Sequence, residues 1–275
     1  MPAQRLAFLG PPGTFTEQAA LLYAPETELI AAPSIADVTQ SVIAGQADEA
    51  ILPIENSLIG PVNETLDLLI HALELKIRAE IVLPIVHCLI GLGGTVFGDV
   101  QAVYSKPEAL DQCVRFLRDE LPAADQRAAL STAAAVEQAL GEPGSVAIAP
   151  ERAAELLGGA VLRRGIEDDH RNKTRFVVLG NDDAAPSGDD KTSLAFHTRD
   201  VPGALVRALQ PFSDAGIDLS KIESRPAKEE LGVYVFLVDC AGHRLDPEVA
   251  GVLEQLRGET TMLKIFGSYP RFADD

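Results

Sequence analysis

A polar stretch near residue 181 divides this chain of 275 residues into two segments with different patterns. Residues 182–190 read Asp-Asp-Ala-Ala-Pro-Ser-Gly-Asp-Asp and lie between two segments rich in strand-forming residues. Small, polar and turn-forming residues at this density are typical of a linker. We therefore expect one domain before the linker and a smaller one after it, because each segment is long enough to enclose its own core.

Before the linker, short apolar runs alternate with helical patterns. We expect strands at 5–10, 49–54, 80–90, 100–104, 145–149 and 175–179, and helices at 17–23, 35–44, 63–73, 109–121, 132–140 and 152–157. Strands that alternate with helices predict an α/β fold with mostly parallel sheets. Ligands of such folds bind where strands end and the next helices begin, so functional residues are expected at those junctions.

After the linker, the expected order is strand, helix, strand, strand, helix, strand. The corresponding ranges are 193–198, 203–215, 217–223, 232–239, 247–256 and 262–269. This βαββαβ order is that of the ferredoxin-like fold. Modules of this kind often sense small molecules or mediate dimerisation.

The charge and the cysteines exclude several classes of function. A net charge of −18 argues against nucleic-acid or anionic-membrane partners, which need clustered Lys and Arg. The first residues show no signal-peptide pattern, and no apolar run is long enough to span a membrane. Three widely spaced cysteines and five histidines without ligand spacing predict free thiols in a reducing cytoplasm and no metal site.

Two junctions carry polar residues directly after expected strands. Residues 10–17 combine a Gly-Pro-Pro-Gly turn with Thr14 and Glu17 at capping-box spacing, which is equally compatible with a capped helix and with an anion site. Glu55, Asn56 and Ser57 place a carboxylate, an amide and a hydroxyl at the end of another strand. Solvated loop residues are the alternative interpretation of that second junction.

Two further junctions, at Ser105 and Ser131, have the order strand, hydroxyl N-cap, helix, and capping alone explains both. Residues 163–175 hold five Lys or Arg against three acidic residues, a local exception in an acidic chain. A solvated loop with internal salt bridges is the alternative. The sequence shows no nucleophile elbow and no Ser-His-Asp order. Together the junctions predict a site that binds a small carboxylated molecule and stabilises a leaving group.

Six short segments in order resemble the prephenate dehydratases with a C-terminal ACT domain. They are residues 10–16, 53–57, 131–135 and 172–176, followed by Gly-Ala-Leu-Val at 203–206 and Glu-Ser-Arg-Pro at 223–226. The resemblance runs from Leu6 to Phe272. It implies a catalytic domain over 1–181, like a type II periplasmic binding protein, with lobe one at 1–79 and 165–181 and lobe two at 80–164. An ACT regulatory domain would follow at 191–275.

The resemblance also implies a function. Prephenate would be converted to phenylpyruvate, CO₂ and water without a cofactor, in phenylalanine biosynthesis. L-phenylalanine would act as allosteric effector at an interface between two ACT domains, so a homodimer or homotetramer is expected. Two alternatives remain open: an arogenate dehydratase of the same fold, and a non-catalytic amino-acid sensor.

The resemblance assigns roles to individual residues. Thr174 would hydrogen-bond the departing hydroxyl, Arg175 would hold a carboxylate, and Glu55, if protonated in a dry cleft, is a candidate proton source. Other catalytic positions would be Asn56, Ser105 and Gln112, and substrate contacts would come from Thr14, Thr16, Ser57, Ser131, Thr132 and Phe176. The phenylalanine site would comprise Gly203, Ala204, Leu205, Val206, Asp218, Glu223, Ser224, Arg225 and Pro226. The family often has Asn in place of Asp218.

Overall fold

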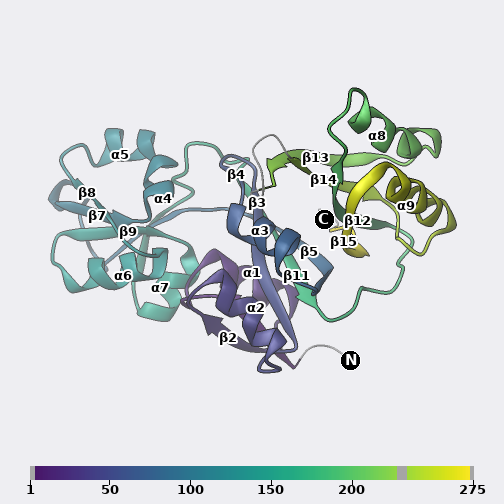
Figure 1. Cartoon of the computed structure of the whole chain (residues 1–275). Helices are drawn as coiled ribbons and strands as arrows, with labels where there is room; N and C mark the ends of the chain where they lie inside the picture. Colours follow the sequence, from purple (N-terminus) through teal and green to yellow (C-terminus); the bar gives the residue numbers. More distant parts are fainter. Residues whose placement is uncertain (1–3, 228–233, 273–275) are drawn as a thin grey trace. The chain divides into compact units, whose positions relative to one another are not determined.

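A computed structural model describes residues 4–227 and 234–272, which form three sheets (Figure 1). The chain divides into two compact units. One comprises the residues up to Val62 together with Ile81–Phe176, and the other comprises Asn63–Glu80 together with the residues from Val177 onward. No helix in the described ranges is both long and apolar enough to cross a membrane.

The first sheet has the strand order β2-β1-β3-β11-β5, with β4 paired to β3. β1 is parallel to both β2 and β3, and its central residues Leu6, Ala7 and Phe8 are buried. Thr14 and Ser34 cap the helices that follow β1 and β2. The elements are β1 (Arg5–Leu9), α1 (Phe15–Tyr23), β2 (Glu28–Ala32), α2 (Ile35–Ile43), β3 (Glu49–Asn56), β4 (Gly60–Pro61), α3 (Asn63–His71), β5 (Lys76–Pro84) and β11 (Lys173–Gly180).

The second sheet has the order β10-β6-β9-β7-β8. Val146 and Ile148 of β9 pack in a cluster with α4 and α5, while Ala147 and Ala149 of the same strand pack with α6 and α7. Alternate residues of a strand face opposite sides, so helices cover both faces. The elements are β6 (Cys88–Gly91), a 3₁₀ turn (Phe97–Asp99), β7 (Ala102–Ser105), α4 (Pro107–Asp111), α5 (Val114–Glu120), β8 (Asp125–Ala128), α6 (Thr132–Gly141), β9 (Ser145–Ala149), α7 (Glu151–Leu157) and β10 (Ala160–Arg164).

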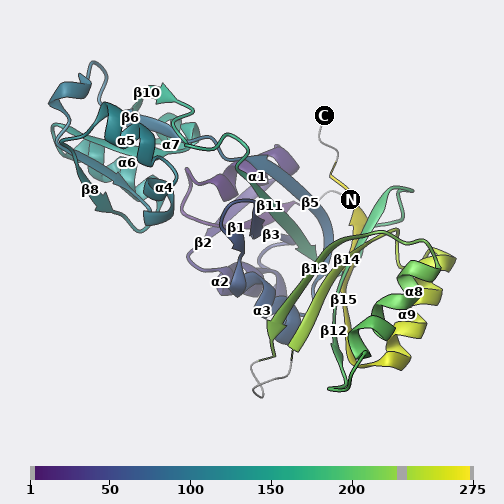
Figure 2. The same cartoon turned by 90° about the horizontal axis from the view of Figure 1, so that it is seen from above.

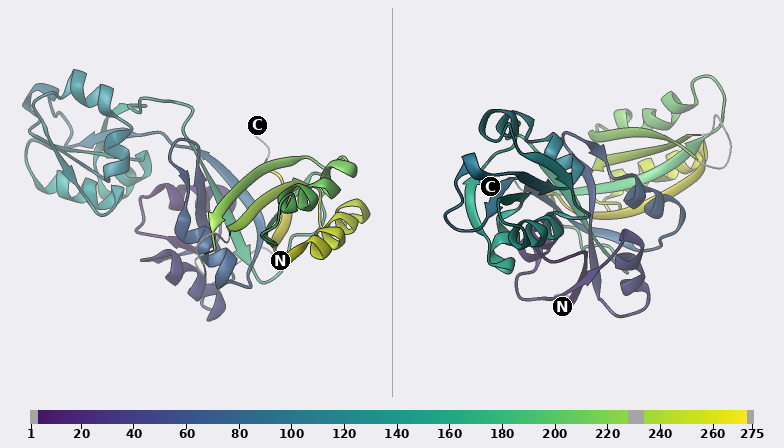
Figure 3. Two further views of the ribbon diagram at one scale, coloured as in Figure 1. Left: turned by 45° about the horizontal axis from the view of Figure 1, so that its top comes forward. Right: turned by 90° about the vertical axis from the view of Figure 1, so that its left-hand side faces the viewer.

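The third sheet has the order β13-β14-β12-β15, and all its neighbouring strands are antiparallel. Helices α8 and α9 lie side by side on one face (Figures 2 and 3). Their core includes Phe196, Phe212 and Leu256. The elements are β12 (Asp190–Thr198), α8 (Ala204–Asp214), β13 (Leu219–Pro226), β14 (Tyr234–Ala241), α9 (Pro247–Glu259) and β15 (Thr260–Pro270). The βαββαβ order is confirmed, although residues 232 and 233 of the expected third strand lie outside the described residues.

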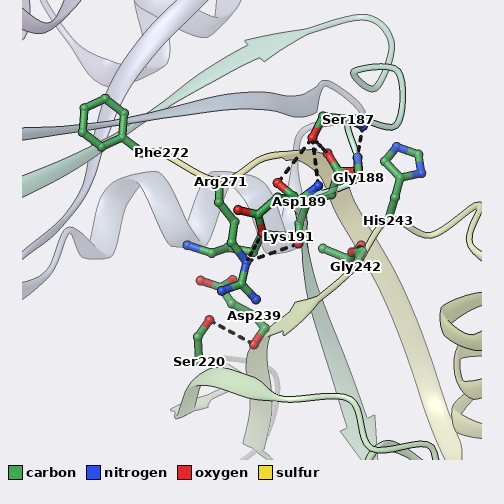
Figure 4. A network of polar contacts seen from close by, with 12 residues as sticks. Ser187, Gly188, Asp189, Lys191, Ser220, Asp239, Gly242, His243, Arg271 and Phe272 are labelled. Atoms are coloured by element: carbon green, nitrogen blue, oxygen red, sulfur yellow. Dashed lines mark hydrogen bonds and ion pairs between the residues drawn. The ribbon is translucent and has the colours of Figure 1, made fainter. Parts of the chain in front are cut away.

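The C-terminal residues of the predicted linker are attached to the third sheet (Figure 4). Buried Asp190 accepts hydrogen bonds from the Ser187 hydroxyl at 2.7 Å and from the backbone N–H of Gly188 at 3.0 Å. Burial raises the pKa of Asp190, but the bonds from Ser187 and Gly188 outweigh it, so the pKa lies below its usual range. The Arg271 backbone N–H donates to the Asp189 carbonyl at 3.0 Å, and Asp183 pairs with Arg244. The stretch is therefore held by specific bonds.

The predicted α/β fold followed by a ferredoxin-like βαββαβ module is confirmed, with corrections in detail. The sheets are mixed, because β6 is antiparallel to both β9 and β10. The strand expected at 80–90 is divided by residues 85–87. This segment hydrogen-bonds to the residues just before β11: the Ile85 N–H donates to the Asn172 carbonyl. The chain therefore leaves the first sheet after Pro84, later than expected.

Two local predictions on the second sheet are wrong. The helix expected at 109–121 is interrupted at Gln112, whose carbonyl accepts from the Asp168 N–H at 2.7 Å instead of from the next helical turn. Ser105 is no N-cap: it ends β7, and Lys106 precedes α4 without a side-chain cap. The short strands β2, β8 and β10 were not expected from the sequence.

Candidate active site

The end of β3 meets the start of β11, and this junction holds Thr174. The Ser57 N–H donates to the Lys173 carbonyl at 2.9 Å, which joins the two chain segments. Beside this bond, the Asn56 side-chain amide donates to the Thr174 hydroxyl oxygen at 2.9 Å. Thr174 is only 9% exposed. The structure therefore brings together two predicted catalytic residues from distant parts of the sequence.

The orientation of Asn56 determines which groups remain for a ligand. Its Oδ1 accepts from the backbone N–H groups of Leu58 at 3.0 Å and Ile59 at 2.9 Å. Backbone N–H groups can only donate, so the other end of the amide must be the NH₂ group. The Thr174 oxygen therefore accepts from Asn56, and within the described residues its own hydrogen has no acceptor. That hydrogen is available to a bound molecule.

Arg175 and Glu55 lie next to this pair. Arg175 Nη1 is 3.9 Å from Glu55 Oε2, and the two side chains are 13% and 37% exposed. A guanidinium beside a donor hydroxyl suits a carboxylated ligand. More than a third of the Glu55 side chain is exposed, and its role as a proton source in a dry cleft stays a prediction.

Three predicted site residues are used by the fold. The Ser57 hydroxyl accepts from the Lys173 N–H at 2.9 Å and donates to the Arg171 carbonyl at 3.3 Å. Ser105 is fully buried, and its hydroxyl donates to the Ile148 carbonyl at 2.6 Å, which ties β7 to β9. Phe176 is 1% exposed and belongs to the core. Each of these residues thus has a structural role within the described residues, and the predicted ligand contacts stay predictions.

The predicted helix-end residues lie at the starts of α1 and α6. The Thr14 oxygen accepts from the Glu17 N–H, and Glu17 in turn accepts from the Gly13 N–H at 2.6 Å, so the expected capping box is present in a shifted form. Ser131 caps α6 by accepting from the Ala134 N–H at 3.0 Å. Thr16 and Thr132 are each 6% exposed.

Gly13 shows that these two helix ends are close together. A Cβ atom on Gly13 would lie 3.4 Å from the Cβ of Ala133 in α6 and 3.2 Å from the Cα of Ala153 in α7. Gly13 also has φ +86°, a conformation that favours glycine. A larger residue would separate the elements that the sequence motifs predict to share a site.

Gln112 contacts two residues that the sequence analysis missed as site residues. Its Oε1 accepts from Asn172 Nδ2 at 2.7 Å and lies 2.9 Å from His87 Nε2. Asn172 is 1% exposed and His87 is 3% exposed. Asn172 belongs to the segment 172–176 and could have been found there, whereas an isolated histidine in an apolar stretch carries no such signal.

The basic stretch 163–175 is partly neutralised by neighbouring carboxylates. Arg164 pairs with Glu151, and Arg171 pairs with Asp169 at 2.6 Å. Its acidic part lines a pocket of about 380 Å³ together with Gln112, Leu58 and Ile59. The interpretation as internal salt bridges therefore holds for Arg171, whereas the partner of Arg164 lies outside the stretch. Arg175, which directly follows Thr174, contacts Glu55.

A separate pocket of about 340 Å³ lies at the start of α8 in the ACT-like module. Its lining includes the predicted residues Gly203, Ala204, Leu205 and Val206, and also Thr198, Arg199, Asp200, Val201, Tyr234 and Phe236. Gly203 has φ +80°, which glycine adopts without strain. The sequence analysis missed Tyr234 and Phe236 because neither residue belongs to one of the sequence motifs.

The remaining predicted effector residues do not line this pocket within one chain. Asp218 precedes β13 and is exposed, near the strand end where Leu219 pairs with Cys240. Pro226 is at the opposite end, paired with the pocket residue Tyr234. Arg225 donates to Asn63 at 2.8 Å and to Asp67 at 3.0 Å on α3. Its guanidinium is therefore already bound to the chain itself.

Comparison with known proteins agrees with this architecture. The prephenate dehydratase family profile matches residues 6–184, and the ACT domain profile matches residues 192–258. The chain belongs to the prephenate dehydratase family. A bifunctional chorismate mutase/prephenate dehydratase of Stutzerimonas stutzeri is 40% identical over 270 residues, which cover 97% of this chain and 73% of that protein.

Two solved structures of this fold are similar over nearly the whole chain. A prephenate dehydratase from Arthrobacter aurescens in complex with L-Phe has a TM-score of 0.89 and 35% identity, covering 97% of this chain and 90% of that one. A protein described as a novel type of quorum quenching acylase, GqqA, has a TM-score of 0.88 and 31% identity, covering 98% of both chains. The fold is thus shared by proteins described with different activities.

The candidate site of this member of the prephenate dehydratase family consists of hydrogen-bonding and charged side chains. Within the described residues, no three His, Cys, Asp or Glu side chains are grouped so as to hold a metal ion. The three cysteines are free and buried, as expected. Burial raises the pKa of Cys88 to about 11 and that of Cys240 to about 12, which keeps them unreactive near neutral pH.

Proposed function

We propose that this protein converts prephenate to phenylpyruvate, CO₂ and water, with Thr174 and Arg175 as catalytic residues. The observation that carries the proposal is the contact of Asn56 with the Thr174 oxygen at 2.9 Å, which leaves the hydroxyl hydrogen for a ligand. Membership of the family and the adjacent guanidinium support the same assignment. Residues 1–181 would form the catalytic domain, with the boundary expected at residue 79 moved to Pro84, so that lobe one comprises 1–84 and 165–181 and lobe two 85–164.

The reaction needs little from the protein beyond orientation and one donor. The bond between the ring and its carboxylate breaks, CO₂ leaves, and the electron pair moves into the ring. The hydroxyl on the opposite ring carbon departs and takes up one proton from solvent, which yields water and an aromatic ring. Thr174 donates a hydrogen bond to the departing oxygen, and Arg175 holds the pyruvyl carboxylate. No cofactor takes part in these steps.

The test is an ultraviolet assay for phenylpyruvate with purified protein and prephenate. A preorganised donor is typically worth about 10²–10³ in rate, so Thr174→Ala is expected to lose that much kcat with a small change in KM. Thr174→Ser retains the hydroxyl and is the matched control, expected to keep most of the activity. Turnover by Thr174→Ala at the wild-type rate would refute the role of Thr174.

Other substrates are separated by the same assay. Turnover of arogenate in preference to prephenate would identify an arogenate dehydratase, and absence of turnover with both would favour a non-catalytic sensor. The similarity to a protein described as a quorum quenching acylase adds cleavage of an acyl group as a third activity to test. Release of the acyl chain without phenylpyruvate formation would replace the proposed function.

We further propose that residues 191–275 bind L-phenylalanine as an allosteric effector, joined to the catalytic domain by the linker 182–190. The pocket at the start of α8 and the L-Phe complex of the Arthrobacter relative support this. Glu223–Pro226 would reach the pocket from the partner subunit of a homodimer or homotetramer, and Asp218 would face the ligand's ammonium. The free buried thiols support a reducing, cytoplasmic location.

Calorimetry tests the effector site. Val201 lines the pocket and is 48% exposed, so Val201→Glu is expected to abolish binding of L-phenylalanine by placing a like charge near its carboxylate. Val96→Glu is the control, because Val96 is 62% exposed and does not line the pocket. Unchanged binding by Val201→Glu would refute the location.

A further inference from the structure

A continuous chain of side-chain contacts connects buried His87 with Thr174. His87 Nε2 is 2.9 Å from Gln112 Oε1, which accepts from Asn172 Nδ2 at 2.7 Å. Asn172 Oδ1 accepts from Asn56 Nδ2 at 2.7 Å, and the same Asn56 group donates to the Thr174 oxygen. Three amides thus lie between an imidazole and the proposed catalytic hydroxyl.

The donor and acceptor roles in this chain follow from its backbone contacts. The N–H groups of Leu58 and Ile59 require Asn56 to present its oxygen to them and its NH₂ to Asn172. Asn172 must then accept through Oδ1 and donate through Nδ2 to Gln112. The Gln112 atom that receives this bond is an oxygen, so the His87 nitrogen facing it must carry a hydrogen.

The surroundings of His87 favour the neutral ring. The side chain is 3% exposed, and among the described residues its Nδ1 has no hydrogen-bond partner. Burial lowers the pKa of His87, while the bond to Gln112 and the charge of Glu167 act in the opposite direction. The Phe15 ring meets the imidazole edge-to-face at 5.4 Å, and Glu167 Oε2 accepts from the His87 backbone N–H at 2.8 Å. His87 is thus a rigid donor through Nε2.

We propose that His87 is a positioning residue, which holds the Gln112 oxygen on Asn172 and thereby stabilises the single amide arrangement that leaves the Thr174 hydrogen free. Without this anchor, the Gln112 amide can rotate and present its NH₂ group to Asn172. The NH₂ groups of Gln112 and Asn172 would then face each other, which disturbs the contact between Asn172 and Asn56. The role deepens the proposed function and rests on it for the catalytic part played by Thr174.

The series of side-chain contacts from His87 to Thr174 does not transfer protons. Gln112 Oε1 accepts hydrogen bonds from both of its neighbours, so a proton passed from His87 would have no onward path to Asn172. No bond forms or breaks along the chain during turnover. Its contribution is orientation, and it is expected to appear in kcat with little change in KM, because none of its first three members is assigned to bind substrate carboxylates.

Two near-isosteric variants distinguish this role from a packing role. The amide nitrogen of Gln in His87→Gln reaches the place of Nε2, whereas that of Asn in His87→Asn reaches the place of Nδ1. We expect His87→Gln to keep kcat within about threefold, and His87→Asn to lose about tenfold or more, the equivalent of one hydrogen bond, with KM nearly unchanged. Equal activity of the two variants, both folded by thermal unfolding, would overturn the proposal.

A measurement on the wild-type protein separates this inference from the proposed function. Nitrogen-15 NMR of the full chain at pH 7.5 is expected to show His87 protonated at Nε2 and unprotonated at Nδ1. The opposite tautomer overturns the inference even if prephenate is turned over. Absence of prephenate turnover by the wild-type protein, with the expected tautomer present, refutes the proposed function and leaves the amide arrangement supported.

Discussion

Replacing Asn56 by Asp changes one NH₂ group to an oxygen at the centre of the candidate site. Three oxygens surround that group: those of Asn172 at 2.7 Å, Thr174 at 2.9 Å and the Lys173 carbonyl at 3.3 Å. An amide has two hydrogens, so the two shorter contacts are the bonds that are lost. At about 1 kcal/mol each, Asn56→Asp is expected to lower the free energy of unfolding by about 2 kcal/mol.

The effect on turnover is expected to be larger and to depend on pH. The loss of the contact that orients Thr174 is expected to cost about 10²–10³ in kcat near pH 7.5. The three oxygens around the new carboxylate oxygen raise the pKa of Asp at position 56, while the Leu58 and Ile59 N–H groups on the other oxygen act in the opposite direction. The protonated form regains one O–H donor toward Thr174. The kcat of Asn56→Asp should therefore rise as the pH falls from about 8 to about 5, relative to the wild type.

The assay is phenylpyruvate formation across this pH range, with urea unfolding of the same samples. Asn63→Asp is the matched control: Asn63 is exposed, and its Oδ1 already accepts from Arg225, so the new carboxylate keeps that bond. The control is expected to retain wild-type kcat and pH profile. If folded Asn56→Asp has a kcat within threefold of the wild type at pH 7.5, the orientation of Thr174 by Asn56 is refuted.

Three further predictions concern stability and coupling. A Cβ on Gly267 would lie 2.1 Å from the Ile77 carbonyl oxygen, so Gly267→Ala is expected to lower the free energy of unfolding by about 1–3 kcal/mol. The control is Gly251→Ala in α9, where a Cβ would have nothing within 4 Å and no such loss is expected. Equal urea midpoints of the two variants would contradict this prediction. Burial lowers the pKa of His87, so as the pH falls below about 6.5 the His87 imidazole takes up a proton in the unfolded state and not in the folded state. The wild type should therefore lose more stability between pH 7.5 and 5.5 than His87→Gln does. Arg225→Met removes the bonds to α3 and is expected to weaken the response of turnover to L-phenylalanine. Calorimetric binding should persist, because the Arg225 guanidinium is bound to α3 and does not contact the effector, and surface Arg207→Met should respond as the wild type does; full inhibition of Arg225→Met would show that this contact does not transmit the signal.

Features that depend on neighbours in the chain were predictable. Thr14 and Ser131 each lie three residues before the N–H that they accept from, so a cap can be identified from spacing alone. The order of elements after the linker also follows from local patterns, since strand and helix differ in their apolar period. These predictions agree with the structure because the interactions concerned span only a few residues.

Features that depend on packing were not predictable. Ser105 has the sequence context of a cap, yet its hydroxyl donates to Ile148, 43 positions away. Arg225 belongs to a segment expected to bind an effector, yet its guanidinium is bound to α3. In both cases the local pattern allows more than one partner, and the partner is chosen by the strand or helix that packs beside it.

The sequence by itself determined the composition of the site: which hydroxyls, amides and cations stand at strand ends, and that one basic residue, Arg175, follows Thr174. The tertiary structure decided which of these groups meet. Asn56 and Thr174 are 118 positions apart and meet only because β3 and β11 are neighbours in one sheet. His87 is connected to the candidate site through its contact with Gln112, which lies between two short helices. A hydrogen bond forms between groups within about 3 Å, and separation along the chain does not determine which groups approach that closely.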